Sequence, residues 1–430
     1  MKTRTLLLAV LLFPLLAGHA VSSSAETTLV RAKAYVDVDK GRLVSPANIL
    51  VEDGMIRAIN EDAPADARVI DLGERYLLPG LMDMHVHLGL DFDSANFAVV
   101  TTESGSEGAL RSARNAGLTL QSGFTTVRSI GQLHPTLDLV DVALAHAIEN
   151  DWVAGPRVIP SGHMISILGG HGDLSMIEGL SEGMLELGPE YGIVNGVDDA
   201  IRATRFQIKH GAKTIKIHAT AGVMSLEDSV GAQQLSDAEM QAIVEEAHRH
   251  DIPVAAHAHG TEGIKAAIRA GVDSIEHGSL LDDEAIALMK EHGVVLVPTS
   301  GLMETMDFNK LNPQKRAKAE YIAPRARASL EKAIKAGVKV AVGTDAPLIA
   351  HGRNAYEIAT MVDRGMTPAQ ALRAATLVPA ELVRVKNLGQ IKTGMHADLI
   401  AVDQNPLDNI RTLEHVPFVM KGGKVYKHNQ

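Results

Sequence analysis

The hydrophobic and polar positions of this chain follow two different patterns, and the difference predicts how the chain is organised. Near both ends, apolar and polar residues alternate with the period of two that is typical of strands, as at 30–36 and 397–402. These runs are short and are separated by turn-forming residues. We therefore expect a small β-sandwich domain built from both chain ends, residues 26–78 together with 386–430.

Between the two ends, short apolar runs alternate with longer segments of helical character, which is the pattern of successive βαβ units. Several runs follow a glycine that would end the preceding helix, as Gly211 and Gly271 do. Eight runs are predicted as strands: 80–88, 125–130, 157–161, 214–219, 253–257, 274–277, 294–299 and 338–343. This α/β pattern predicts a (β/α)8 TIM-type barrel over residues 79–385. An open, doubly wound sheet is the alternative, but it does not explain where the polar residues fall.

The first 25 residues have the pattern of a secretory signal peptide. Lys2 and Arg4 precede an apolar run at 6–16, and small residues follow it. The run is shorter than the roughly 20 residues that a membrane-spanning helix needs, although an uncleaved anchor is the alternative. We therefore expect residues 1–25 to act as a signal peptide for export to the periplasm or the medium, with cleavage after Ala20 or Ala25 leaving no membrane anchor.

Composition then narrows the classes of function. The net charge is −11 and no basic stretch occurs, which argues against a nucleic-acid partner, because phosphate binding needs a basic surface. The chain has no cysteine. It therefore forms no disulfide, and any metal site must use nitrogen and oxygen ligands.

Histidines and acids gather at the C-terminal ends of the predicted strands, where barrel enzymes place their catalytic groups. His85 and His87 share one face of the first strand and can reach one cation, although such a pair alone is equally well explained as structural. Metal-type ligands also occur at four further strand ends: Lys216, His257 with His259, His277 and Asp345. Coincidence is a poor explanation for five strand ends of this kind.

Lys216 lies among apolar residues on the fourth predicted strand, where a buried ammonium group is costly. One interpretation is a charged lysine paired with a carboxylate. The other is a neutral amine carboxylated by CO2, whose anionic carbamate could bridge two metal ions. Taken alone, the residues favour the first interpretation.

The ordered set of HxH, Lys, His, His and Asp resembles the binuclear members of the amidohydrolase superfamily. The matching strings are LPGLMDMHVH at 78–87, IKI at 215–217, GVMS at 222–225, HAHG at 257–260, IEHG at 275–278 and GTDA at 343–346. They are most similar to the branch of imidazolonepropionase-like prolidases and Xaa-Pro or Xaa-Arg dipeptidases, close to the amidohydrolases that hydrolyse ochratoxin A.

The resemblance implies two divalent metal ions, for which zinc suits the ligands, with manganese, cobalt or iron as alternatives. In such a site His85, His87 and Asp345 would bind one ion, His257 and His277 the other, and a carboxylated Lys216 would bridge them. The implied reaction is hydrolysis of the amide bond of an N-acyl amino acid, a dipeptide or ochratoxin A by a bridging hydroxide. Asp345 would act as general base and then acid. The implied partner is a small amide substrate, and branch members are commonly homo-oligomers.

Four further residues are candidates for contacts with the substrate. His259 is the second histidine of its pair, and His163 and His171 lie in glycine-rich loops after the third predicted strand. Arg353 follows the eighth predicted strand and could meet a substrate carboxylate. Each also has an ordinary structural explanation, as a loop residue or an exposed arginine.

Two other functions stay open. One is a cyclic C–N hydrolase related to imidazolonepropionase or enamidase, which resembles mononuclear sites without a bridging lysine, so Lys216 argues against it. The other is a periplasmic binding protein on a degenerate barrel, and the intact set of ligands argues against that.

Overall fold

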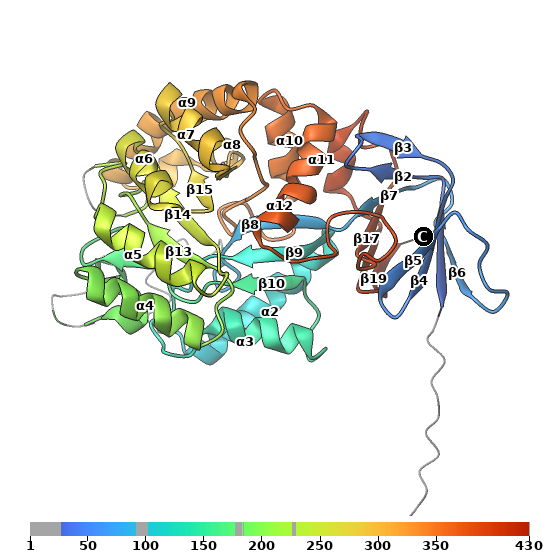
Figure 1. Cartoon of the computed structure of the whole chain (residues 1–430), viewed down its shortest axis with the longest axis horizontal. Coiled ribbons are helices and arrows are strands. Elements are labelled where there is room, and N and C mark those ends of the chain that lie inside the picture. The colour runs from blue at the N-terminus through green and yellow to red at the C-terminus, as the bar shows by residue number, and fades with distance from the viewer. Residues whose placement is uncertain (1–26, 92–101, 177–182, 184, 226–228, 430) are drawn as a thin grey trace, which may run out of the picture.

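The computed structural model describes residues 27–91, 102–176, 183, 185–225 and 229–429, so the predicted signal peptide lies outside the described residues. Strands dominate both ends of the chain, and helices dominate its middle (Figure 1). Among the described residues, no helix combines the length and the apolar composition that crossing a bilayer requires.

The two ends of the chain share a sheet. The N-terminal strands are β1 (Thr28–Ala32), β2 (Ala34–Asp37), β3 (Arg42–Val44), β4 (Ala47–Glu52), β5 (Met55–Ile59), β6 (Arg68–Asp71) and β7 (Tyr76–Pro79), and the C-terminal strands are β17 (Leu399–Val402), β18 (Phe418–Lys421) and β19 (Lys424–His428). They form a sheet of order β5-β4-β1-β6 and another of order β19-β18-β17-β7-β2-β3. Because β17 pairs with β7, the C-terminal strands extend a sheet that the N-terminal strands begin.

The middle of the chain contains the predicted parallel strands. They are β8 (Leu81–Val86), β9 (Phe124–Ser129), β10 (Arg157–Pro160), β13 (Ile215–His218), β14 (Val254–Ala258), β15 (Ser274–His277) and β16 (Val295–Val297), with the short β11 (Ser166–Ile167) and β12 (Ile193–Val194) between them. These strands form parallel sheets of order β10-β9-β8 and β13-β14-β15-β16, and β11 pairs with β12. Seven of the predicted strands are thus present, with bounds shifted by a few residues.

The eighth predicted strand, 338–343, does not form a regular strand. Instead of pairing along its length, this segment forms an isolated parallel β-bridge between Val340 and Leu296. The next hydrogen bonds go elsewhere, because Val342 accepts from the amide of Met84 and donates to the carbonyl of Ala374. The segment is extended, but its hydrogen bonds are divided among different neighbours.

Backbone hydrogen bonds connect the two parallel sheets at both edges. At one edge, the segment containing Val342 joins β16 to β8. At the other, the amide of Lys213 donates to the carbonyl of Pro160, and the amide of Ile165 donates to the carbonyl of Lys216. The strands therefore direct their C-terminal ends to one common rim.

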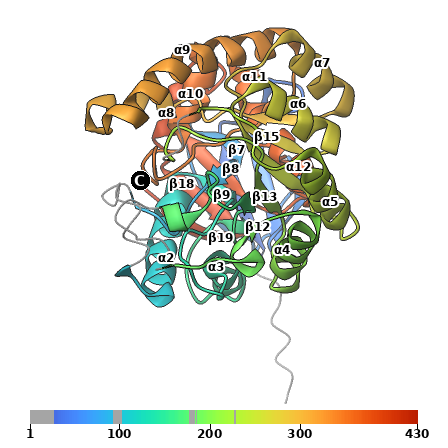
Figure 2. The same cartoon turned by 90° about the vertical axis from the view of Figure 1, so that its left-hand side faces the viewer.

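Helices surround the parallel strands (Figure 2). They are α2 (Gly105–Gln121), α3 (Val140–Glu149), α4 (Val197–Lys209), α5 (Asp237–His248), α6 (Thr261–Ala270), α7 (Asp283–His292), α8 (Leu302–Thr305), α9 (Pro313–Ala336), α10 (Ala355–Asp363), α11 (Pro368–Ala374) and α12 (Leu377–Leu382). A capping box formed by Ser236 and Glu239 starts α5. Gly271, with a φ of 95°, ends α6 in the left-handed conformation that favours glycine.

Candidate metal centre

Histidine and aspartate side chains gather at the rim formed by the C-terminal ends of the parallel strands. Their ligand atoms form three groups, and within each group these atoms lie within 4.8 Å of one another. The first group is His85, His87 and Asp345, the second is His257, His259 and His277, and the third is His171, His218 and His257. The rings of His85 and His277 are 5.1 Å apart between centroids, so the first two groups adjoin.

In the first group, His85 and His87 each direct one ring nitrogen at Asp345. Asp345 Oδ1 lies 3.4 Å from His85 Nε2 and 3.3 Å from His87 Nε2. The other nitrogens have acceptors, because His85 Nδ1 is 2.9 Å from Glu276 Oε2 and His87 Nδ1 is 3.1 Å from the carbonyl oxygen of Gly131. These acceptors favour the proton on each Nδ1, which leaves each Nε2 lone pair facing Asp345. Electron-rich atoms so close together repel one another unless a positive charge lies among them, either a proton on a ring or a metal cation.

Asp345 is ionised in this environment. Burial by itself raises the pKa of its carboxyl group, but the neighbouring His85 and His87 lower that pKa well below its usual value. Asp345 also has a φ of 56°, in the left-handed region, as do His277 with 69° and Thr299 with 48°. Backbone strain of this kind concentrates at functional sites, where the surrounding structure maintains it.

A buried ion pair supports His85 from behind. Arg128 Nη2 lies 2.7 Å from Glu276 Oε1, and both side chains are fully buried. Arg128 also donates from Nε to the carbonyl of Met84 at 2.7 Å and from Nη1 to Ser274 Oγ at 3.0 Å. Burial alone raises the pKa of Glu276, but the guanidinium and His85 lower it to about 2. An ionised carboxylate therefore orients the His85 ring.

The second group consists of neutral histidines. Burial lowers the pKa of His257 and His277 well below the usual value and that of His259 to about 3, so each ring keeps the lone pair that a metal ligand needs. His277 Nδ1 lies 2.8 Å from Thr299 Oγ1, and His259 Nδ1 lies 2.7 Å from Ser279 Oγ. His257 Nε2 is buried and has no hydrogen-bond partner among the described residues. A buried nitrogen of this kind is costly unless it binds something, which fits a metal ligand.

The third group adds two histidines on the other side of His257. The His171 ring stacks on it with centroids 4.3 Å apart, and His171 Nδ1 lies 2.6 Å from Ser225 Oγ. The His218 ring is 5.1 Å from that of His257. Because both groups use His257, the second and third groups are not independent sites.

Lys216 faces the same rim from β13. Burial lowers the pKa of its amine to about 8, and the carboxylates of Glu276 and Asp345 act against this shift. Lys216 is therefore near enough to both acids to interact with them electrostatically. A lowered pKa also makes the neutral amine, the form that reacts with CO2, more available than in an exposed lysine.

The structure brings together most of the residues that the sequence predicts. The predicted ligands at the rim are His85, His87, Lys216, His257, His277 and Asp345, and the predicted substrate contacts His171 and His259 lie among them. His218, Glu276 and Arg128 also belong to this region, and none of them is among the residues predicted as ligands or substrate contacts. His218 could have been found, because it shares a strand face with Lys216.

Two predicted substrate contacts lie apart from these groups. His163 is buried, and its Nε2 lies 2.9 Å from the carbonyl oxygen of Thr136. Arg353 is exposed, and its guanidinium lies 5.8 Å from the centre of the Tyr356 ring. Within the part of the chain that the structure describes, neither forms a hydrogen bond, ion pair or ring contact with the three groups, so their substrate roles stay predictions.

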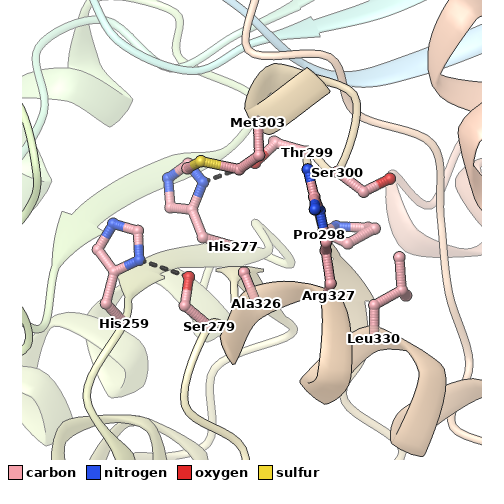
Figure 3. A pocket seen from close by; sticks show the side chains of 10 residues that line it. All are labelled: His259, His277, Ser279, Pro298, Thr299, Ser300, Met303, Ala326, Arg327 and Leu330. Carbon is pink, nitrogen blue, oxygen red and sulfur yellow. Dashed lines mark hydrogen bonds between the residues drawn. The ribbon is translucent and has the colours of Figure 1, made fainter. Parts of the chain in front are cut away.

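A pocket lies beside the second group (Figure 3). Its lining comes from the ends of β14 and β15, the segment after β16, and helices α8 and α9. The lining residues are His259, His277, Ser279, Pro298, Thr299, Ser300, Met303, Ala326, Arg327 and Leu330. His259 and His277 of the second group thus face a pocket whose surface is mainly apolar.

Comparisons with known proteins agree on one family. A family model described as the amidohydrolase family matches residues 76–426. Ochratoxinase from Aspergillus niger is 36% identical over 435 residues, which cover 95% of this chain and 88% of that protein. The structure of a Xaa-Pro dipeptidase with methionine bound in its active site is 37% identical with a TM-score of 0.86, covering 93% of this chain and 100% of that one. A prolidase complexed with N-methylphosphonate-L-proline is 32% identical with a TM-score of 0.82, covering 94% and 100%.

Proposed function

The chain belongs to the amidohydrolase family, and we propose that it is a metal-dependent enzyme that cleaves the amide bond of N-acyl amino acids or dipeptides. The observation that carries this proposal is the convergence of metal-type ligands from distant strands at one rim. The names of its relatives, an ochratoxinase, a dipeptidase and a prolidase, support an amide substrate and make ochratoxin A a candidate.

The proposal includes the architecture that positions the site. The two parallel sheets would form one (β/α)8 barrel over residues 79–385, which the hydrogen bonds at both of their edges support. Residues 26–78 and 386–430 would form a β-sandwich, which the pairing of β17 with β7 supports.

The residues present fit a pair of divalent cations. His85, His87 and Asp345 would hold one ion, and His257 and His277 the other. Lys216, carboxylated, would lie between them. Ligands of nitrogen and oxygen suit zinc. When bound, such ions bring the pKa of a water molecule near neutrality and polarise a carbonyl group.

Asp345 is placed to move the proton in this reaction. Its ionised carboxylate can accept a proton from the attacking water and return it to the leaving amine, so that amide and water become a carboxylic acid and an amine. His259 belongs to the second group and also lines the pocket. Its Nδ1 is fixed by Ser279, which leaves the other ring nitrogen to contact the substrate.

The proposed activity is tested with metal-loaded protein and a panel of N-acyl-phenylalanine, Xaa-Pro, Xaa-Arg and ochratoxin-like substrates. We expect release of the free amine from at least one of them, loss of activity on chelation, and recovery when zinc is added back. Released amine is measured by chromatography. Turnover of cyclic imides or lactams alone would show that the peptidase assignment is wrong.

The second metal group gives a separate prediction. Replacing His257 with Asn is expected to lower the metal content from two ions per chain to one, because His257 is a proposed ligand whose buried Nε2 has no hydrogen-bond partner among the described residues. Inductively coupled plasma mass spectrometry measures the content. The matched variant His218→Asn also removes a buried nitrogen without a partner among the described residues, but His218 is not one of the proposed ligands, so both ions are expected to remain. If His218→Asn lost an ion and His277→Asn did not, the third group would be the second metal site.

We further propose that the chain is exported, which Lys2, Arg4 and the apolar run at 6–16 support. The net charge of −11 supports a small-molecule partner rather than a nucleic acid. Assembly into a homo-oligomer is proposed from the resemblance to the family branch alone.

A further inference from the structure

Helix α9 forms one wall of the pocket beside His259 and His277. Ala326, Arg327 and Leu330 come from this helix. Figure 3 shows the two histidines on one side of the pocket and Arg327 on the other. A substrate whose scissile bond lay at the histidines would therefore extend its far end toward a guanidinium group.

The charge of Arg327 is only partly balanced by its neighbours. Arg327 Nε lies 3.0 Å from Glu304 Oε1, and the same oxygen contacts Arg364 Nη2. One carboxylate thus serves two guanidinium groups, so the three side chains carry a net charge of +1 (two positive, one negative). Glu331 lies 3.7 Å from Arg364 and is 54% exposed, so solvent screens much of its charge.

We propose that Arg327 is a specificity-determining residue, which binds a carboxylate on the amine half of the substrate. This inference rests on the proposed function. The ion pair with Glu304 uses Nε, and the two terminal nitrogens can donate the parallel hydrogen bonds that a carboxylate accepts. Pro298, Met303 and Leu330 provide apolar surface for the carbon chain between the scissile amide and that carboxylate.

The carboxylate can be the α-carboxylate of the released amino acid or one on its side chain, and three compounds of nearly equal size separate these sources. N-acetylglutamine has only an α-carboxylate, N-acetylglutamic acid α-amide has only a side-chain carboxylate, and N-acetylglutamine α-amide has neither. We expect metal-loaded wild-type protein to prefer one of the two acids over the neutral compound by at least about 10-fold in kcat/KM. Where turnover of these compounds is slow, the inhibition constant of each compound, measured in competition with the best substrate, replaces kcat/KM in the comparison.

Arg327→Gln is expected to reduce this preference to below about 3-fold, mainly through KM, while the neutral compound is little affected. Arg327→Lys keeps the charge but not the fork of donors and is expected to be intermediate. Arg325→Gln is the matched control, because this guanidinium of the same helix stacks 3.8 Å from the centre of the Tyr321 ring and does not line the pocket. Metal content and circular dichroism establish that each variant is folded.

Equal values of kcat/KM, or equal inhibition constants, for the three compounds in the wild type would overturn the role of Arg327. A preference for an acid that survives in Arg327→Gln would do the same. If Arg327→Gln does not fold, the Lys variant decides, since an unchanged preference in it contradicts recognition by the fork. Failure of the proposed function looks different. In that case the wild type hydrolyses no N-acyl amino acid at all, and the dissociation constants of the three compounds, measured by isothermal titration calorimetry, still show whether Arg327 selects a carboxylate.

Discussion

Asparagine at position 345 is expected to lower kcat by about 10²- to 10⁴-fold on whichever N-acyl amino acid the wild-type protein hydrolyses. Asparagine has nearly the same shape as aspartate, but it cannot take a proton from water and return it to an amine. The ring nitrogens of His85 and His87 lie 3.4 Å and 3.3 Å from Asp345 Oδ1, so the lost charge is central to the site. Initial rates over a range of pH measure the effect.

Asp345 is also a proposed metal ligand, so metal content must be measured on the same Asp345→Asn sample. A large loss of kcat with unchanged metal content supports the proton-transfer role, whereas loss of one ion supports the ligand role. Asp66→Asn, in an exposed turn of the N-terminal strands, is the control and should leave kcat unchanged. Full activity of the Asp345 variant would contradict both roles.

The sequence predicts those parts of the fold and site that depend on local patterns. His85 and His87 lie on one face of a strand because side chains alternate along strands. The rim position of Lys216, His257 and His277 follows from the same rule together with the shared direction of parallel strands. To predict these positions it is enough to know where each strand lies, where it ends and in which direction it runs. A few neighbouring residues indicate all three.

The features that the sequence does not reveal depend on contacts between distant segments. The pairing of Arg128 with Glu276 joins β9 to β15, and neither residue has a local pattern that indicates the other. The extended segment at 338–343 has the composition of a strand, but its neighbours divide its hydrogen bonds. Arg327 reaches the pocket because α9 packs beside the segment after β16, whereas sequence proximity to a strand end suggests Arg353.

Replacing Arg128 with methionine is expected to lower the free energy of unfolding by about 3–5 kcal/mol, because the change leaves the carboxylate of Glu276 buried without its cation. Both side chains are fully buried, and the guanidinium also donates to the carbonyl of Met84 and to Ser274. Activity should fall as well, since Glu276 would no longer be held in place to orient His85. Urea denaturation of the metal-loaded proteins measures the stability.

An ion pair whose carboxylate has a second cation provides the control. Arg205 binds Glu246 through two nitrogens at 2.8 Å and 3.0 Å, and its side chain is 61% exposed. Glu246 is buried but also has Arg249 Nη1 at 2.7 Å, so Arg205→Met should cost no more than about 1 kcal/mol. Arg128→Lys should be intermediate, because one ammonium group cannot reproduce the geometry of the planar guanidinium. If Arg128→Met were as stable as Arg205→Met, water or a shifted proton would have to compensate for the buried charge of Glu276. In that case the ion pair would not determine the orientation of the His85 ring. That orientation would have to come from the metal ion that His85 is proposed to bind.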